Sequence, residues 1–189
     1  MSEIVVQKFG GTSVGTVDRI DSVAEIIKNA SKSNKIVVVV SAMGGETNRL
    51  VDLAKAFGDD PDKREFDALV STGETVSSAL LAMALHSKGV KAKSFSASQI
   101  SMRTTSSYSK AKILDVDAKK ILDVVENDTI PIITGFQGVT EGGDVTTLGR
   151  GGSDTTAVAI AAQIAATRCD IFTDVDGIFT TDPSVVPNA

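Results

Sequence analysis

The sequence predicts an α/β fold with a mostly parallel sheet, because short apolar runs alternate along the chain with segments of helical periodicity. The apolar runs are continuous and rich in β-branched residues, which is typical of strands that helices cover on both faces. The 189 residues match the usual size of one domain, and no linker or internal repeat divides them.

Four apolar runs are the expected strands of this sheet. They are Ile4–Val6, Ile36–Val40, Ile130–Ile133 and Ile171–Thr173. Proline has no N–H group to donate within a sheet, so the third strand is expected to begin at or just before Pro131.

Apolar residues at helical spacing predict the helices between these strands. The expected helices are Val17–Ala30, Thr47–Phe57, Glu65–Ser87 and Thr155–Ala166. Gly73 is expected to interrupt the third helix, and the fourth is apolar almost all round, as in a helix packed between layers. The polar stretch Ser94–Ile113 has weak periodicity, and it is compatible with a hairpin, a mobile flap or an ordinary surface excursion.

Composition and charge exclude several classes of protein. Lys and Arg number 19 against 24 Asp and Glu, and only 4% of residues are aromatic, so a nucleic-acid partner is disfavoured. A single cysteine, Cys169, and a single histidine, His86, exclude a disulfide framework and the usual Cys- or His-rich metal sites, which fits a cytoplasmic protein. No signal peptide is visible, and the apolar stretch around Ala157–Ala166 is shorter than the ~18 residues of a membrane span.

Glycines cluster after the expected strands, where α/β sheets bind ligands. The segment from Lys8 to Gly15 ends the first strand and opens a helix, whose free N–H groups and dipole attract anions. Lys8 adds a positive charge. This is no Walker A loop, because Thr16 stands where the lysine of that motif should follow Gly15. The alternative interpretation is a glycine turn whose Ser or Thr caps the helix.

A second glycine-rich segment, Leu148–Thr156, also coincides with a helix start. Ser153 and Asp154 are natural N-cap residues. Arg150 stands between glycines, where an unshielded guanidinium can bind a carboxylate through two hydrogen bonds. The alternative is a surface arginine beside a good cap.

Three more segments carry candidate side chains. Ser41 and Thr47 flank a small-residue turn, and either they bind small polar ligand atoms or Thr47 caps the next helix. Glu74 would bind an ammonium group or be a solvated acid. The segment Asp174–Asp182 hints at a calcium loop but lacks the register and closing Glu of one, so a nucleoside pocket and a plain turn remain open.

Six segments, in order along the chain, resemble the amino acid kinase family and, within it, the aspartokinases. They are Val6–Ser13, Val40–Gly44, Ser71–Glu74, Ile133–Gly138, Thr146–Ala157 and Thr173–Gly177. The resemblance implies a three-layer αβα sandwich of the carbamate kinase-like type. It also implies ATP-dependent phosphorylation of the L-aspartate β-carboxylate to 4-phospho-L-aspartate, the first step toward lysine, threonine and methionine. Mg²⁺ would accompany ATP, held mainly by phosphate oxygens and water, and the protein would be a cytoplasmic homo-oligomer.

The resemblance also implies roles for individual residues. Lys8 would contact the transferring phosphate, and Asp154 would orient catalytic lysines. Glu74 would receive the α-ammonium group of aspartate. The residues expected to line the phosphates are Gly10, Gly11 and Ser13. Those expected to bind an aspartate carboxylate are Arg150 and its helpers Ser41, Thr47, Gly151 and Ser153. Those expected to wall the adenine and ribose are Thr173, Asp174, Phe179 and Asp182.

The chain departs from the family pattern at two positions on the nucleotide side. Many aspartokinases have Tyr in place of Phe179 and Arg in place of Ser184, so ATP binding would be weaker or altered in geometry. Residues 1–189 would be a C-terminally truncated catalytic domain without the regulatory ACT domains that usually follow. Two alternatives remain open. One is another amino acid kinase, of the UMP or acetylglutamate kinase type, and the other is a non-catalytic nucleotide-binding or assembly module.

Overall fold

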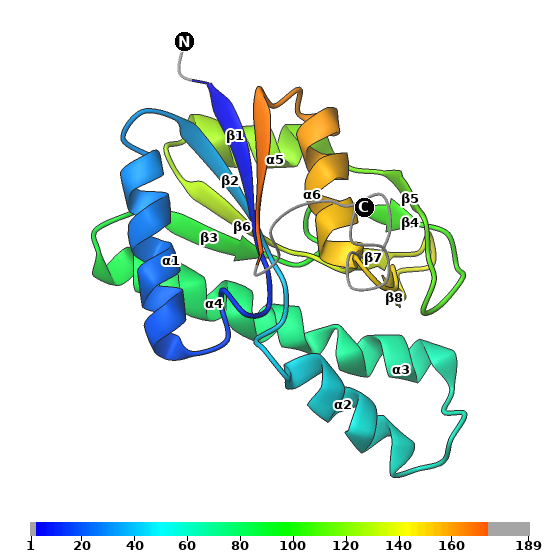
Figure 1. The fold of residues 1–189 in the computed structure, drawn as a ribbon. Helices are drawn as coiled ribbons and strands as arrows, with labels where there is room; N and C mark the ends of the chain where they lie inside the picture. The colour runs from blue at the N-terminus through cyan, green and yellow to red at the C-terminus, as the bar shows by residue number, and fades with distance from the viewer. Residues whose placement is uncertain (1–2, 174–189) are drawn as a thin grey trace, which may run out of the picture.

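The computed structural model describes residues 3–173, and its central sheet has five parallel strands in the order β3-β6-β2-β1-β9 (Figure 1). The strands are β1 (Ile4–Phe9), β2 (Lys35–Val40), β3 (Ala92–Phe95), β6 (Ile130–Thr134) and β9 (Arg168–Phe172). The predicted parallel sheet is confirmed, and β6 begins at the residue before Pro131 as expected. β3 has no apolar run in the sequence, because its two middle residues are polar, as an edge strand tolerates; it was therefore not predicted.

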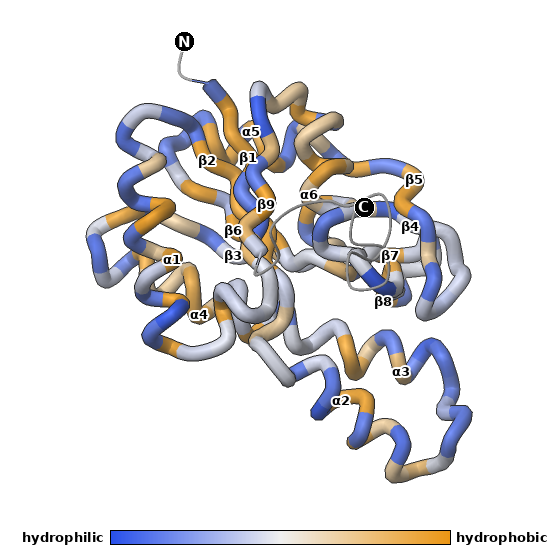
Figure 2. The backbone as a smooth tube through the Cα atoms, viewed as in Figure 1, coloured by the Kyte–Doolittle hydropathy of each residue, from blue (hydrophilic) through white to orange (hydrophobic). Residues whose placement is uncertain are grey.

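Helices cover both faces of this sheet and make three layers. The helices α1 (Val17–Ala30) and α4 (Thr72–Ser87) pack with Val5 and Phe9 of β1 in one apolar core. The helices α5 (Ala118–Glu126) and α6 (Gly152–Gln163) pack with Val6 on the opposite face. The side chains of a strand alternate between faces, so β1 contributes to both cores. Figure 2 shows these apolar residues concentrated along the central strands.

The predicted helices are present, but their bounds shift: α2 ends at Lys55 rather than Phe57 and α6 at Gln163 rather than Ala166, and the sequence did not indicate α5. α1 has the expected bounds, and the Thr16 side chain accepts a hydrogen bond from the Arg19 N–H at its start. The long third helix divides into α3 (Lys63–Val70) and α4 at Ser71, two residues before Gly73. α2 (Glu46–Lys55) starts after Gly45 and α6 after Gly151, and both of these glycines have left-handed backbone conformations.

A second, four-stranded sheet lies beside the sandwich, in the order β5-β4-β7-β8. Its strands are β4 (Arg103–Thr104), β5 (Ile113–Asp115), β7 (Gln137–Val139) and β8 (Val145–Thr147). β4 and β5 pair antiparallel, so the polar stretch Ser94–Ile113 contains β4 and the turn of a hairpin that ends just beyond it, at Asp115; the hairpin was one of its predicted forms.

The helices α2 and α3 form an arm that projects from the body of the molecule (Figure 1). In the described chain, one helical stretch, Lys63–Ser87, is long and apolar enough to cross a membrane by length and composition alone. Half of its most apolar window is buried inside the fold, and α4 packs on the central sheet. It therefore has the burial of a core helix in a globular domain.

Close packing requires the glycine at position 73. A Cβ atom there would lie 2.8 Å from the Cβ of Ala42, which follows β2. Helix propensity alone favours Ala over Gly by about 1 kcal/mol. We nevertheless expect Gly73→Ala to lower the free energy of unfolding by about 1–3 kcal/mol, the scale of overpacking.

Chemical denaturation measures this change. Thr75→Ala is the matched control, because Thr75 is exposed on the same helix and should gain a few tenths of a kcal/mol from propensity. A Gly73→Ala protein as stable as the control would contradict the packing argument.

Candidate active site

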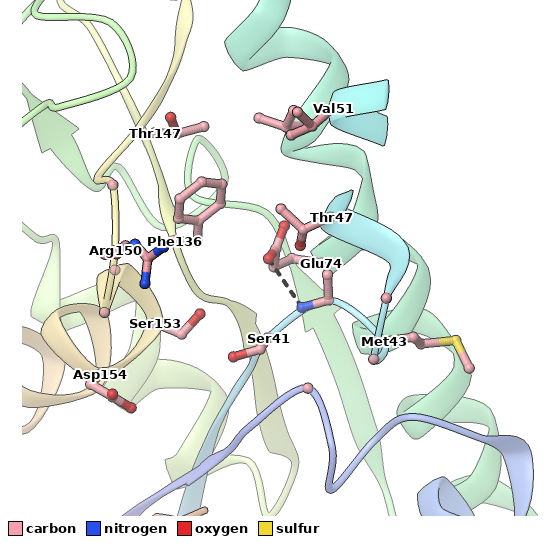
Figure 3. Close-up of a pocket in the computed structure, with 18 of the residues that line it drawn as sticks. Ser41, Met43, Thr47, Val51, Glu74, Phe136, Thr147, Arg150, Ser153 and Asp154 are labelled. Atoms are coloured by element: carbon pink, nitrogen blue, oxygen red, sulfur yellow. Dashed lines mark hydrogen bonds between the residues drawn. The ribbon is translucent and has the colours of Figure 1, made fainter. Parts of the chain in front are cut away.

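A cavity of about 600 Å³ opens at the carboxyl ends of β1 and β2 (Figure 3). Its walls come from the loops after these strands, the starts of α2, α4 and α6, and one side of α3. Ligands of open α/β sheets bind at this edge. The cavity brings together nine of the residues singled out from the sequence, namely Lys8, Gly11, Ser41, Thr47, Glu74, Arg150, Gly151, Ser153 and Asp154.

Lys8 is a buried cation in the lining of the cavity. It lies near the end of β1, and its side chain is 8% exposed. Its Nζ atom lies 2.6 Å from Oδ1 of Asp154, in the first turn of α6. Burying an ammonium group is costly unless it is paired. The ion pair therefore lets a positive charge stand inside the fold at the edge of the sheet.

The glycine loop after β1 runs close to neighbouring backbone. The Gly10 N–H donates to the Phe172 carbonyl, and a Cβ atom on Gly10 would come within 3.5 Å of the Lys8 Nζ atom. Gly11 lines the cavity, where a Cβ atom would lie 3.0 Å from the Ala42 carbonyl oxygen. Gly10 and Ser13 belong to the same loop but do not line the cavity. The loop thus places the backbone of Gly11 and the residue Thr12 in the cavity lining with Lys8.

Glu74 places a buried carboxyl group in the cavity wall. Its side chain is nearly inaccessible, and Oε1 accepts a hydrogen bond of 3.0 Å from the Ala42 N–H (Figure 3). Oε2 is buried and has no hydrogen-bond partner among the described residues. Burial raises the pKa of this carboxyl group to about 7, although the bond from Ala42 opposes the shift. An unpaired buried acceptor is unfavourable, so the wall is suited to an N–H donor or a cation from a ligand.

Arg150 stands on a glycine turn at the opposite wall. Gly149 and Gly151 on either side have φ values of 82° and 69°, a left-handed conformation that side chains disfavour. The arginine is exposed and lines the cavity. Its guanidinium group is therefore available to a carboxylate in the cavity.

The start of α6 corrects the expected N-cap. Gly151 is the N-cap residue, whereas Ser153 and Asp154 lie in the first turn of the helix, because the left-handed backbone at Gly151 begins it earlier. Ser153 packs against Gly135, where a Cβ atom would lie 2.7 Å from the serine side chain. The helix N-terminus therefore faces the cavity with Ser153 and Asp154.

Ser41 and Thr47 form the wall beside Glu74. The Ser41 carbonyl accepts a hydrogen bond from the Ser77 hydroxyl, which anchors the end of β2 to α4. Thr47 is the second residue of α2, and Gly45 rather than Thr47 is the N-cap of that helix. Both side chains line the cavity and point toward the same space as Glu74 (Figure 3).

The nucleotide-side predictions lie mostly beyond the described residues. Thr173 follows β9 and does not line the cavity. Asp174, Phe179 and Asp182, as well as Ser184, fall outside residues 3–173. Sequence reasoning gave no role to several cavity residues, namely Thr12, Met43, Val51, Phe66, Val70, Ser109, Phe136 and Thr147. Of these, Thr12, Met43, Phe136 and Thr147 stood within the quoted motifs, and Phe136 has a left-handed backbone.

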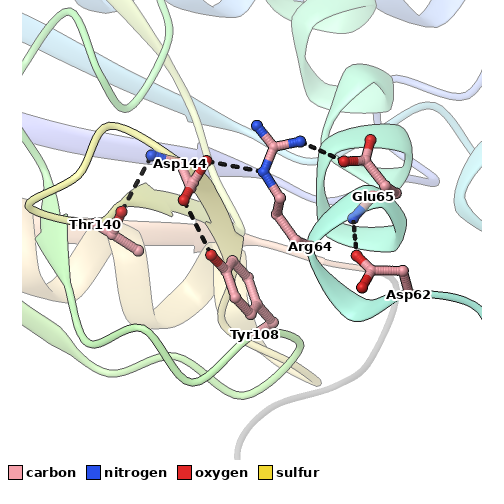
Figure 4. Close-up of polar contacts among 6 residues, drawn as sticks. All are labelled: Asp62, Arg64, Glu65, Tyr108, Thr140 and Asp144. Carbon is pink, nitrogen blue, oxygen red and sulfur yellow. Dashed lines mark hydrogen bonds and ion pairs between the residues drawn. The ribbon is translucent and has the colours of Figure 1, made fainter.

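A surface network ties the arm to the second sheet (Figure 4). Arg64 of α3 donates to Asp144 over 2.9 Å, and the Tyr108 hydroxyl donates to the same carboxylate over 3.1 Å. Arg64 also pairs with Glu65. The hydrogen bonds from Arg64 and then Tyr108 lower the pKa of Asp144. The network joins α3 to the turn before β8 and to the β4–β5 hairpin.

Comparison with known proteins agrees with this geometry. The model of the amino acid kinase family matches residues 3–189. An aspartate kinase of Stutzerimonas stutzeri (strain A1501) is 56% identical over 187 residues, which cover 98% of this chain and 45% of the relative. The chain thus spans a little under half the length of that relative.

Solved structures with the same fold include two aspartate kinases. An aspartate kinase from Synechocystis aligns with a TM-score of 0.80 at 46% identity, over 97% of this chain and 30% of the other. E. coli aspartokinase III, solved in complex with aspartate and ADP, aligns with a TM-score of 0.86 at 32% identity, over 97% of this chain and 52% of the other. The fold, the cavity and these matches together show that the chain belongs to the amino acid kinase family.

Proposed function

We propose that this chain carries the catalytic centre of an aspartate kinase, which transfers the γ-phosphoryl group of ATP to the β-carboxylate of L-aspartate. One observation carries the proposal: a single cavity contains the unpaired carboxylate oxygen of Glu74, the exposed guanidinium of Arg150 and the buried ammonium of Lys8. This set is complementary to an amino acid with one ammonium and two carboxylate groups. The named relatives that bind or phosphorylate aspartate support the same substrate.

The proposed reaction needs no general base, because the acceptor carboxylate is already a nucleophile. One β-carboxylate oxygen attacks the γ-phosphorus, the bond to the β,γ-bridging oxygen breaks, and ADP leaves with the electron pair. The obstacle is the approach of an anion to a polyanion, so catalysis would consist of positioning and charge neutralisation. Lys8 would neutralise charge on the transferring phosphate, and Asp154 would hold the lysine in place.

The acceptor would lie between the two walls of the cavity. Glu74 would bind its α-ammonium group, and Arg150 would bind a carboxylate through its planar fork. The small polar groups beside them would complete this contact, namely Ser41, Thr47, Gly151 and Ser153. The product would be 4-phospho-L-aspartate, and the step would open the route to lysine, threonine and methionine.

The nucleotide would approach from the glycine loop. Gly10, Gly11 and Ser13 would line its phosphates, while Thr173 and the segment Asp174–Asp182 would wall the nucleoside. No group of three or more His, Cys, Asp or Glu side chains in residues 3–173 is arranged to hold a metal ion. Because ATP carries several phosphate charges, we infer that Mg²⁺ enters with the nucleotide, held mainly by phosphate oxygens and water. That the protein forms a homo-oligomer remains a prediction.

Trapping of the acyl phosphate with hydroxylamine separates this function from its alternatives. Aspartyl hydroxamate formed from ATP and aspartate would support the proposal. Turnover with UMP or N-acetylglutamate alone would instead indicate another kinase of the family. Nucleotide binding without any turnover would indicate an assembly module. The assay is run on this chain and on a longer one that includes further family sequence.

Removing the charge of Lys8 should lower turnover most strongly. We expect Lys8→Ala to reduce kcat by at least ~10²-fold, the effect of losing one group that stabilises transition-state charge. Lys35→Ala is the control, because Lys35 is the first residue of β2 and therefore lies at the end of that strand opposite to the cavity. Steady-state kinetics with near-normal kcat in Lys8→Ala would refute the assignment of this lysine.

Arg150 should affect the acceptor rather than the nucleotide. We expect Arg150→Ala to weaken aspartate binding by about 10- to 100-fold, the range for hydrogen bonds to a charged group. The control is Arg103→Ala, which removes an exposed arginine of the second sheet. Calorimetric titrations with aspartate and with an ATP analogue measure the two affinities. A fall in nucleotide affinity alone would reverse the assignment.

The raised pKa of Glu74 makes stability depend on pH. Because its pKa rises from 4.5 to about 7 on folding, the folded protein binds this proton more tightly than the unfolded chain. The contribution of Glu74 to the free energy of unfolding is therefore fully present below pH 4.5 and is lost as pH rises through about 7. We expect the wild type to lose on the order of 3 kcal/mol relative to Glu74→Gln between pH 4.5 and pH 8.

Denaturation of both proteins at several pH values measures this difference. A parallel pH dependence in wild type and Glu74→Gln would show that the carboxyl group titrates normally. Saturating aspartate should narrow the difference at pH 8, because its ammonium group would compensate the ionised Glu74.

A further inference from the structure

Asp67 is a buried acid that the proposed reaction leaves unused. It lies on α3 between Phe66 and Val70, which line the cavity, but its own side chain is completely inaccessible. A buried carboxylate is costly unless hydrogen bonds replace its hydration. The described structure provides four such bonds, and all of them come from two residues of the cavity wall.

Each of these residues donates twice to Asp67. Oδ2 accepts from the backbone N–H groups of Ser109 and Thr147, both over 2.8 Å. Oδ1 accepts from their hydroxyl groups, over 3.0 Å and 2.9 Å. The partners lie 42 and 80 residues away in sequence. One carboxyl group thus joins α3 to the β4–β5 hairpin and to the end of β8.

Both partners support the Arg150 turn. Thr147 ends β8 only three residues before Arg150. Ser109 has a left-handed backbone with φ of 64°, which is unfavourable for a non-glycine residue, so its conformation needs outside support. Its carbonyl oxygen would lie 3.4 Å from a Cβ atom on Gly149, the first residue of the turn. Asp67 therefore binds two residues that adjoin the Arg150 turn: Ser109 packs against its first residue, and Thr147 precedes it in the chain.

We propose that Asp67 is a positioning residue that acts through Ser109 and Thr147 to fix the Arg150 turn for binding of the acceptor carboxylate. Its expected kinetic effect rests on the proposed function, whereas its structural effect does not. The carboxyl group touches neither substrate. Its loss should raise KM for aspartate and leave KM for ATP unchanged, since the glycine loop at Lys8 lies on another wall.

Two substitutions at Asp67 separate hydrogen-bond geometry from charge. In Asp67→Asn, the amide oxygen can accept the two backbone bonds, and its NH₂ group can donate to the two hydroxyl oxygens, which rotate to accept. Asp67→Ala removes all four bonds. We expect KM for aspartate to rise about tenfold or more in Asp67→Ala and to stay within about threefold of wild type in Asp67→Asn.

The matched control is Arg64→Gln on the same helix. It breaks the exposed tie to Asp144, which joins the same elements at the surface, and an exposed ion pair contributes little. We expect KM for aspartate to change by less than about threefold. Steady-state kinetics of the full-length protein measure KM for aspartate and for ATP in each variant. An unchanged KM for aspartate in Asp67→Ala, or an equal rise in both KM values, would overturn the proposal.

Amide hydrogen exchange tests Asp67 independently of the reaction. The N–H groups of Ser109 and Thr147 should exchange slowly in wild type and in Asp67→Asn, and at least about tenfold faster in Asp67→Ala. Fast exchange of these amides in wild type would overturn the proposal even if Asp67→Ala failed to fold. If wild type did not phosphorylate aspartate, the proposed function would fail, while slow exchange would still establish the tie through Asp67.

Discussion

The ion pair between Lys8 and Asp154 joins the central sheet to α6, the helix whose first turn lines the candidate site. Lys8 is in a strand whose other residues are mostly buried apolar groups, and its ammonium group is tolerable there because the carboxylate lies 2.6 Å away. The same contact holds the first turn of α6 over the end of β1. The glycine turn that carries Arg150 immediately precedes α6, so the ion pair between Lys8 and Asp154 also helps to position this turn.

Charge in the cavity is distributed to suit a zwitterion. Arg150 is an exposed cation, Lys8 is a buried cation, and Glu74 is a carboxyl group whose burial raises its pKa; all three line the cavity. The protein has a net charge of −5, so cations must be gathered locally to attract anions. A nearby ammonium group would favour the ionised form of Glu74 and oppose the effect of its burial.

Ties between distant segments hold the other wall of the cavity. α3 is short, and it is joined to the second sheet by the buried Asp67 and, at the surface, by Arg64 and Asp144. Low dielectric strengthens the buried bonds, while solvent weakens the exposed ones. The inner tie therefore governs the geometry of the wall, and the outer network adds little to it.

The sequence by itself determined four of the five strands described in the central sheet, most helices and many cavity residues, because these follow from local pattern. β-branched runs indicated β1, β2 and β6, apolar spacing indicated α1, and glycines after strands indicated the edge where ligands bind. Tertiary structure alone decided the helix starts at Gly45 and Gly151, since φ is not visible in a residue name. Tertiary structure also determined that Oε2 of Glu74 has no hydrogen-bond partner among the described residues and that Asp67 accepts four hydrogen bonds. Those states depend on burial and on partners at least 32 residues away, which no local pattern encodes.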